Sequence, residues 1–157
     1  TALVVLAGCA GESGQLDTAT LETAIPSALV PDAPELVTGV RCPVEISRGV
    51  GLATGCTASI NGTTVAIRVE QTDDQGSVRV TTDAVLLKVE NLADDLAEEL
   101  ARDIGVEVSA SCAGPSVLVP AAGQTLNCTA LDTESRPIEF VVTLTDALGG
   151  YEVRITD

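Results

Sequence analysis

The sequence predicts an α+β fold: two tandem copies of a helix packed on a four-stranded antiparallel sheet, with one disulfide in each copy. Three observations support this prediction. A pattern recurs with a period of about seventy residues, cysteines are paired at similar spacing in each half, and the hydrophobic residues are almost all aliphatic. Phe140 and Tyr151 are the only aromatic residues. Val, Ile, Leu, Ala and Thr must therefore fill the core, and β-branched residues favour strands.

The two halves of the chain match at several places in the same order, which indicates an internal repeat rather than chance. The matching segments are Cys42 with Cys112, Cys56-Thr57-Ala58 with Cys128-Thr129-Ala130, Thr72-Asp73 with Thr145-Asp146, and 78–83 with 153–157. The period is too long for a solenoid, so it suits two copies of one small domain. Those copies are expected over residues 18–83 and 84–157.

Each copy opens with a helical pattern. In the first, the apolar residues follow a cap at Asp17 or Thr18; they are Leu21, Ala24, Ile25, Ala28 and Leu29. In the second, Leu92, Leu96, Leu100 and Ile104 recur every four residues, the spacing of one helix face. Asn91 is expected to cap this helix and Gly105 to end it.

Alternating segments that follow each helix predict strands. In the first copy they are 37–47, 52–60, 63–71 and 77–82, and in the second 106–112, 124–131, 138–145 and 151–156. Asn61-Gly62 indicates a two-residue hairpin turn. Ile138, Phe140, Val142 and Leu144 are expected to face the second helix.

The N-terminus resembles the end of a secretory signal peptide. An apolar run leads to Leu6-Ala7-Gly8-Cys9, which is similar to the bacterial lipobox, where the cysteine is acylated and the preceding peptide is removed. Residues 1–8 are then a residual signal peptide and residues 9–17 a lipidated tether. We therefore expect an exported protein, anchored by acylated Cys9 to the outer face of the cytoplasmic membrane.

Four cysteines remain once Cys9 is set aside, and an even number in an exported chain predicts disulfides. We expect Cys42 to pair with Cys56, and Cys112 with Cys128, because each pair falls inside one repeat. Closing such a loop stabilises a fold by about 3 kcal/mol in the chain-entropy model. A zinc site is the alternative, but it lacks close CxxC spacing and any histidine.

Composition argues against catalysis. The chain has no His, which removes the commonest general base and metal ligand. Adjacent acids occur at 73–74, 94–95 and 98–99, but neighbouring carboxylates on a turn or an outward helix face do not converge on a substrate. We expect no catalytic residues, metal or cofactor. The net charge of −15 repels phosphate backbones, so no nucleic-acid partner is expected.

The first helix, the Cys42-Pro43 and Cys56-Thr57-Ala58 steps and the closing Thr-Asp strands resemble a known family. It is the actinobacterial secreted and lipoprotein domain called domain of unknown function 4333. The resemblance covers about residues 20–83 and 90–157, although the second copy has Cys112-Ala113 in place of Cys-Pro. It implies an exported, disulfide-bonded fold and no particular reaction. The doubled α+β arrangement is also similar in architecture to the β-lactamase inhibitory protein.

The functional hypothesis is a non-catalytic cell-surface lipoprotein that binds a protein partner, as yet unidentified, through its sheets. The residues predicted to be exposed on the last strands, and so to form the interaction surface, are Arg79, Tyr151, Glu152 and Arg154. One alternative is a carrier of a lipid or small apolar ligand in a cavity between helix and sheet. Another is an inhibitor of a secreted enzyme, which the shortage of aromatic anchors disfavours.

Overall fold

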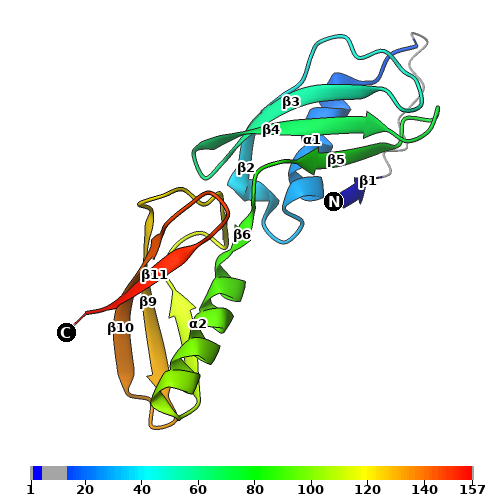
Figure 1. Cartoon of the computed structure of the whole chain (residues 1–157). Helices are drawn as coiled ribbons and strands as arrows, with labels where there is room; N and C mark the ends of the chain where they lie inside the picture. The colour runs from blue at the N-terminus through cyan, green and yellow to red at the C-terminus, as the bar shows by residue number, and fades with distance from the viewer. Residues whose placement is uncertain (1, 5–13, 157) are drawn as a thin grey trace. The chain divides into compact units, whose positions relative to one another are not determined.

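The computed structural model describes residues 2–4 and 14–156, and it divides into two compact units, Thr1–Ala84 and Val85–Asp157 (Figure 1). Each unit combines one α-helix with an antiparallel sheet and contains one disulfide. The predicted α+β class and both disulfides are therefore confirmed.

Helix α1 of the first unit, Thr18–Leu29, begins at the predicted cap. The Asp17 carboxylate accepts hydrogen bonds from the backbone amides of Ala19 and Thr20, at 3.0 and 3.4 Å. These two amides have no partner inside the helix, so the carboxylate satisfies them. The buried side of α1 consists of Leu21, Ile25 and Ala28. A short 3-10 helix, η1 (Pro34–Leu36), leads into the sheet.

The sheet of the first unit has five strands, not the four predicted. Its order is β1-β5-β4-β3-β2. The strands are β1 (Ala2–Val4), β2 (Val37–Arg41), β3 (Ala53–Ile60), β4 (Thr63–Gln71) and β5 (Val78–Thr82). The extra strand is β1, which lies within the segment interpreted as a residual signal peptide. Its backbone pairs antiparallel with the outer edge of β5, in the register Leu3 to Arg79.

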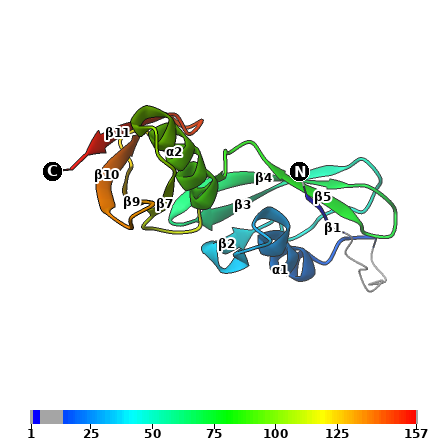
Figure 2. The ribbon, with the colours of Figure 1, turned by 90° about the horizontal axis from the view of Figure 1, so that it is seen from below.

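Strands β3 and β4 form the hairpin that the sequence predicted. Asn61 and Gly62 have φ angles of 48° and 82°, the left-handed values that a two-residue turn of this kind requires. Along β4, side chains alternate between buried and exposed, and Figure 2 shows α1 lying on one face of the sheet. Only one face of this sheet therefore packs into the core.

Helix α2 of the second unit, Val89–Ile104, begins two residues before the predicted cap. The expectation that Asn91 caps it is wrong, because a short pair of strands fixes the start. That pair joins β6 (Leu87–Lys88) to β8 (Val117–Leu118), and the Val89 amide donates to the Ser116 carbonyl at 2.9 Å. Gly105 ends the helix as predicted, with φ 74°.

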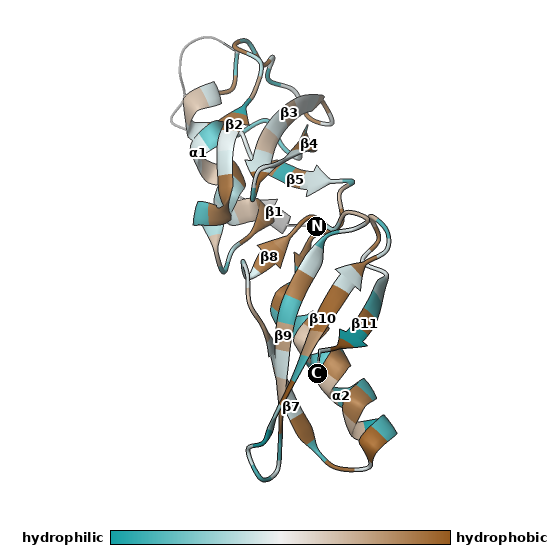
Figure 3. Cartoon of the chain, turned by 90° about the vertical axis from the view of Figure 1, so that its left-hand side faces the viewer, coloured by the Kyte–Doolittle hydropathy of each residue, from teal (hydrophilic) through white to brown (hydrophobic). Residues whose placement is uncertain are grey.

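The sheet of the second unit has four strands in the order β11-β10-β9-β7. They are β7 (Val108–Cys112), β9 (Thr125–Asp132), β10 (Pro137–Leu144) and β11 (Tyr151–Ile155). Phe140, Val142 and Leu144 are at most 1% exposed and pack with Leu92 and Leu96 of α2. Figure 3 shows the alternation of hydrophobic and hydrophilic residues along β9 and β10. The predicted helix-facing side of β10 is confirmed.

Candidate interaction surface

Both disulfides join the first long strand of a sheet to the strand beside it. Cys42 bonds to Cys56, just after β2 and within β3, with Cα atoms 4.4 Å apart. Cys112 of β7 bonds to Cys128 of β9, its direct partner in the strand register, with Cα atoms 4.0 Å apart. All four cysteines are therefore cross-linked, and none of them offers a thiolate as a nucleophile or metal ligand.

The face of the second sheet that lies opposite α2 is uncovered by any helix of that unit. We call it the second outer face. It consists of the residues that alternate with the buried ones, namely Ser109, Ser111, Thr125, Asn127, Thr129, Leu131, Pro137, Glu139, Val141, Thr143, Glu152 and Arg154. A depression of about 610 Å³ lies among these residues, beside the disulfide of Cys112 and Cys128. Its lining combines the polar side chains of Ser111, Asn127 and Thr129 with apolar ones such as Val141.

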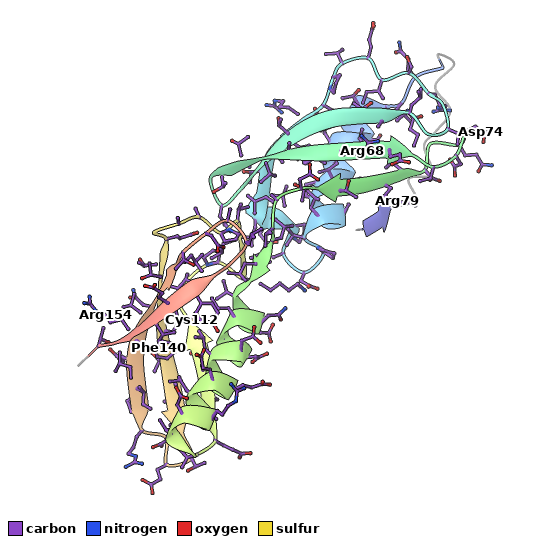
Figure 4. The ribbon with its side chains drawn as sticks, in the orientation of Figure 1. Arg68, Asp74, Arg79, Cys112, Phe140 and Arg154 are labelled. Atoms are coloured by element: carbon purple, nitrogen blue, oxygen red, sulfur yellow. A yellow bond between two sulfur atoms is a disulfide. The ribbon has the colours of Figure 1, made fainter. Side chains whose placement is uncertain are left out.

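The corresponding face of the first sheet, the first outer face, carries a mixed group of charges. Glu70 lies opposite Arg79 in the register of β4 and β5. The Glu70 carboxylate is also 3.9 Å from the Arg68 guanidinium, and the two side chains are 37% and 65% exposed. Figure 4 labels Arg68 and Arg79 on these two strands. An exposed pair of this kind contributes little to stability, so these charges are available to a partner.

The four residues predicted to form the surface do not share one face. Arg79 is exposed on the first outer face, and Glu152 and Arg154 are exposed on the second. Tyr151 points instead to the side of α2, where it is only partly exposed and packs against the core of its unit. Burial raises its pKa, and the nearby Glu99 carboxylate raises it further. Cys9 lies outside the described residues.

Several aspartates have lowered pKa values, but each serves a turn rather than a reactive centre. Asp73 accepts hydrogen bonds from the amides of Gln75 and Ser77, and Asp146 accepts from those of Leu148 and Gly150. Hydrogen bonding to these donors stabilises the charged carboxylates and lowers their pKa values. Asp132 is held in the same way by a turn.

Metal-ligating side chains do not converge in the part of the chain that the structure describes. No group of three or more His, Cys, Asp or Glu residues within it could hold a metal ion. Among the same residues, no helix has both the length and the apolar character needed to cross a membrane.

Sequence reasoning missed most of the second outer face, although the signal was present. Asn127, Thr129 and Glu139 alternate with residues predicted to be core, so their outward direction follows from the two-residue period of a strand. It also missed the exposure of Val153 and Ile155, which are 39% and 60% exposed. Those two share the α2 side of β11, and alternation alone predicts that such residues are buried.

Comparison with known families supports the resemblance for the first unit. Residues 3–76 match the family model described as domain of unknown function DUF4333. The DUF4333 match ends at the turn between β4 and β5, so it includes α1, the disulfide of Cys42 and Cys56, and the hairpin that follows. No curated protein and no solved structure matches the chain.

Proposed function

We propose that this chain is a non-catalytic lipoprotein of an actinobacterial cell, anchored by acylated Cys9 at the outer face of the cytoplasmic membrane, where it binds a protein partner. The observation that carries the proposal is the one-sided covering of each sheet. A helix packs on one face, the disulfide lies on that covered side, and the other face stays uncovered by that helix. Because each sheet is cross-linked on its covered side, the uncovered face is held in a fixed shape for recognition of a folded partner.

The two units are further proposed to be copies of one domain. The second cysteine of each disulfide lies opposite a buried core residue, Ile67 in β4 and Phe140 in β10. In both units a Thr-Asp step then opens the turn that leads to the last strand. The Thr72 amide donates to the Ser77 carbonyl in one turn, and the Thr145 amide donates to the Gly150 carbonyl in the other.

Two further details bear on the duplication. In each unit the residue before the helix cap pairs with the segment that follows the first cysteine. The Leu16 amide donates to the Ile46 carbonyl, and Leu87 of β6 pairs with Leu118 of β8. The strand register also places Val80, not Val78, in the position of Val153. The match between the closing strands that the sequence suggested is therefore displaced by two residues, which keeps each side chain on the same face.

The carrier alternative requires space between a helix and its sheet. In the second unit that space is filled by Phe140, Leu96 and Leu126, none more than 5% exposed. A depression of about 380 Å³ lies at the margin, between α2 and the loop after Cys112. An apolar ligand would therefore have to displace packed side chains, which favours surface binding over transport.

The anchor is tested by changing Cys9 to Ala in the producing cell. We expect the wild-type protein to partition with membranes and to carry the mass of its acyl chains, and the variant to lose both properties. A wild-type protein that lacks acyl mass, or that stays in the soluble fraction, would refute the lipoprotein proposal.

The binding face is tested by photo-crosslinking on intact cells. A photoreactive residue placed at Asn127, on the second outer face, should capture one reproducible protein. The matched control is the same residue at Glu98, which is exposed on the opposite side, on α2. If both positions capture the same background proteins, the proposed binding role of the outer face is wrong.

A further inference from the structure

The last strand of the second unit, β11, leaves one edge of its sheet bare. It stands at the end of the strand order, so among the described strands it pairs only with β10. The last strand of the first unit, β5, pairs on both sides, with β4 and with β1. The exposure of the two strands differs as well. Val80 in the middle of β5 is 2% exposed, and Val153 in the middle of β11 is 39% exposed.

Backbone hydrogen bonds show which groups face the bare edge. The Thr145 amide donates to the Gly150 carbonyl at 2.7 Å, and the Thr156 amide donates to the Glu139 carbonyl at 3.0 Å. Bonding residues alternate along an antiparallel strand, so the even-numbered residues of β11 bond to β10. The residues that direct their amides and carbonyls outward are Tyr151, Val153 and Ile155.

The side chains on β11 carry opposite charges at a spacing of two. Glu152 and Arg154 both lie on the second outer face and both are exposed, and Figure 4 labels Arg154 near the end of the strand. On the other side of the strand, Val153 and Ile155 leave apolar surface in water. The strand has neither the proline nor the bulge that commonly protects an edge.

We propose that β11 pairs antiparallel with β11 of a second copy of this chain, about a two-fold axis at Val153. In this register Val153 meets Val153 of the second copy, and Tyr151 meets Ile155 of the second copy. Each meeting uses backbone groups that point outward, so the ladder forms without disturbing β10. The four-stranded sheets of the two copies then join into one continuous sheet.

Charge selects this register over its neighbours. With Val153 on the axis, Glu152 lies opposite Arg154 of the second copy, and by symmetry this pair occurs twice. A shift by two residues places Glu152 opposite Glu152 of the second copy, or Arg154 opposite Arg154 of the second copy. Like charges directly opposite each other destabilise a strand pair. A shift by one residue would place an outward-facing residue such as Val153 opposite a residue whose amide and carbonyl already bond to β10.

The pair is expected to be weak, because a five-residue edge is smaller than a standard interface. Dissociation constants in roughly the micromolar to millimolar range suit it, and confinement to a surface would raise the effective concentration. This pairing depends only on the geometry of β11 and not on the lipid anchor. The pairing proposal can therefore be wrong while the anchor proposal is right, and the anchor proposal can be wrong while the pairing proposal is right.

The first experiment measures mass by sedimentation in the full, unacylated chain at up to about 1 mM. All samples carry Cys9→Ser, so that no intermolecular disulfide mimics the pair. We expect a shift from 15.9 kDa towards twice that mass as concentration rises. Glu152→Arg and Arg154→Glu should each weaken association by roughly ten- to a hundredfold.

Charge exchange supplies the matched controls. The double variant Glu152→Arg/Arg154→Glu should associate like the wild type, because each charge again meets its opposite in the second copy. A mixture of the two single variants should associate more tightly than either alone. A chain that stays at 15.9 kDa throughout, or single variants that associate unchanged, would overturn the proposal.

The second experiment locates the contact residue by residue. Amide resonances of Tyr151, Val153 and Ile155 should shift with protein concentration and gain protection from hydrogen exchange. Those of Glu152 and Arg154 should change less, because β10 already holds their amides. Concentration-dependent shifts confined to another part of the chain would show that copies associate through a different surface, and the β11 proposal would then be wrong.

Discussion

The Tyr151 hydroxyl donates a hydrogen bond to a Glu99 carboxylate oxygen at 3.3 Å, and so joins β11 to α2 across 52 residues of sequence. The Tyr151 ring packs at the margin of the core that α2 and the sheet form between them. A neutral phenol can donate to a carboxylate and a phenolate cannot. The contact therefore couples the ionisation of Tyr151 to the packing of the last strand.

Removing the Glu99 charge should lower the pKa of Tyr151. Burial is the larger cause of the raised pKa and Glu99 the next, so Glu99→Gln should return the pKa only partly towards 10. The chain has one Tyr and no Trp, so phenolate absorbance near 295 nm reports this residue alone. Glu98→Gln, which removes a neighbouring charge, is the control, and an equal shift there would contradict a specific role for Glu99.

The same contact predicts a loss of stability in alkali. A group whose folded pKa is raised contributes stability that is complete below its unfolded pKa and is lost as the pH rises through the folded one. The melting temperature of wild-type protein should therefore fall more steeply above about pH 10 than that of Tyr151→Phe. Parallel curves for the two proteins would show that Tyr151 ionisation does not affect folding.

Loss of the Asp146 carboxylate should destabilise the second unit at neutral pH but not in strong acid. Its pKa is lowered chiefly by the Gly150 amide and then by the Leu148 amide. The stability that the charged carboxylate contributes is therefore present above the ordinary aspartate pKa of 3.8, and it is lost as the pH falls through the lowered pKa. Asp146→Ala should lower the melting temperature at pH 7, with the gap to wild type narrowing towards pH 2. Asp74→Ala, an exposed acid in the corresponding turn of the first unit, should change it little. A gap that persists at low pH would contradict this account.

Removing one disulfide should destabilise mainly the unit that contains it. The joint variant Cys112→Ala/Cys128→Ala should lose about 3 kcal/mol in the free energy of unfolding of the second unit. Tyr151 lies in that unit, so its fluorescence follows this transition during urea denaturation. The corresponding variant at Cys42 and Cys56 should shift the circular dichroism transition and leave the Tyr151 signal in place. Equal shifts from both variants would show that the two units unfold together.

Truncating Phe140 should be the costliest single change in the core of the second unit. The side chain is 1% exposed and belongs to the cluster beneath α2, so Phe140→Ala should cost roughly 3–5 kcal/mol. Phe140→Leu, which keeps most of the volume, should cost less and still fold. Val141→Ala removes an apolar group from the second outer face instead, and it should change the free energy of unfolding by about 0.5 kcal/mol or less. Similar costs at positions 140 and 141 would place the core on the wrong face.

The local pattern of the sequence was enough to predict most of the elements. The Asp17 cap, the Gly105 stop, the Asn61-Gly62 hairpin and the inward side of β10 all follow from spacing within a few residues. The disulfide pairing also followed, because the two cysteines of each pair lie close in the sequence and within one predicted copy. Each of these features depends on residues that are close together in the sequence, so the sequence alone is enough to predict it.

Only the tertiary structure decided where α2 starts, which strands join the first sheet and what covers β11. The start of α2 depends on a strand pair between segments about thirty residues apart, and β1 adds a fifth strand to the first sheet by pairing with β5. Alternation gave Tyr151, Val153 and Ile155 a common side, but not their burial, which depends on how far α2 extends across the sheet. The period of a strand determines direction, whereas exposure depends on what packs against it.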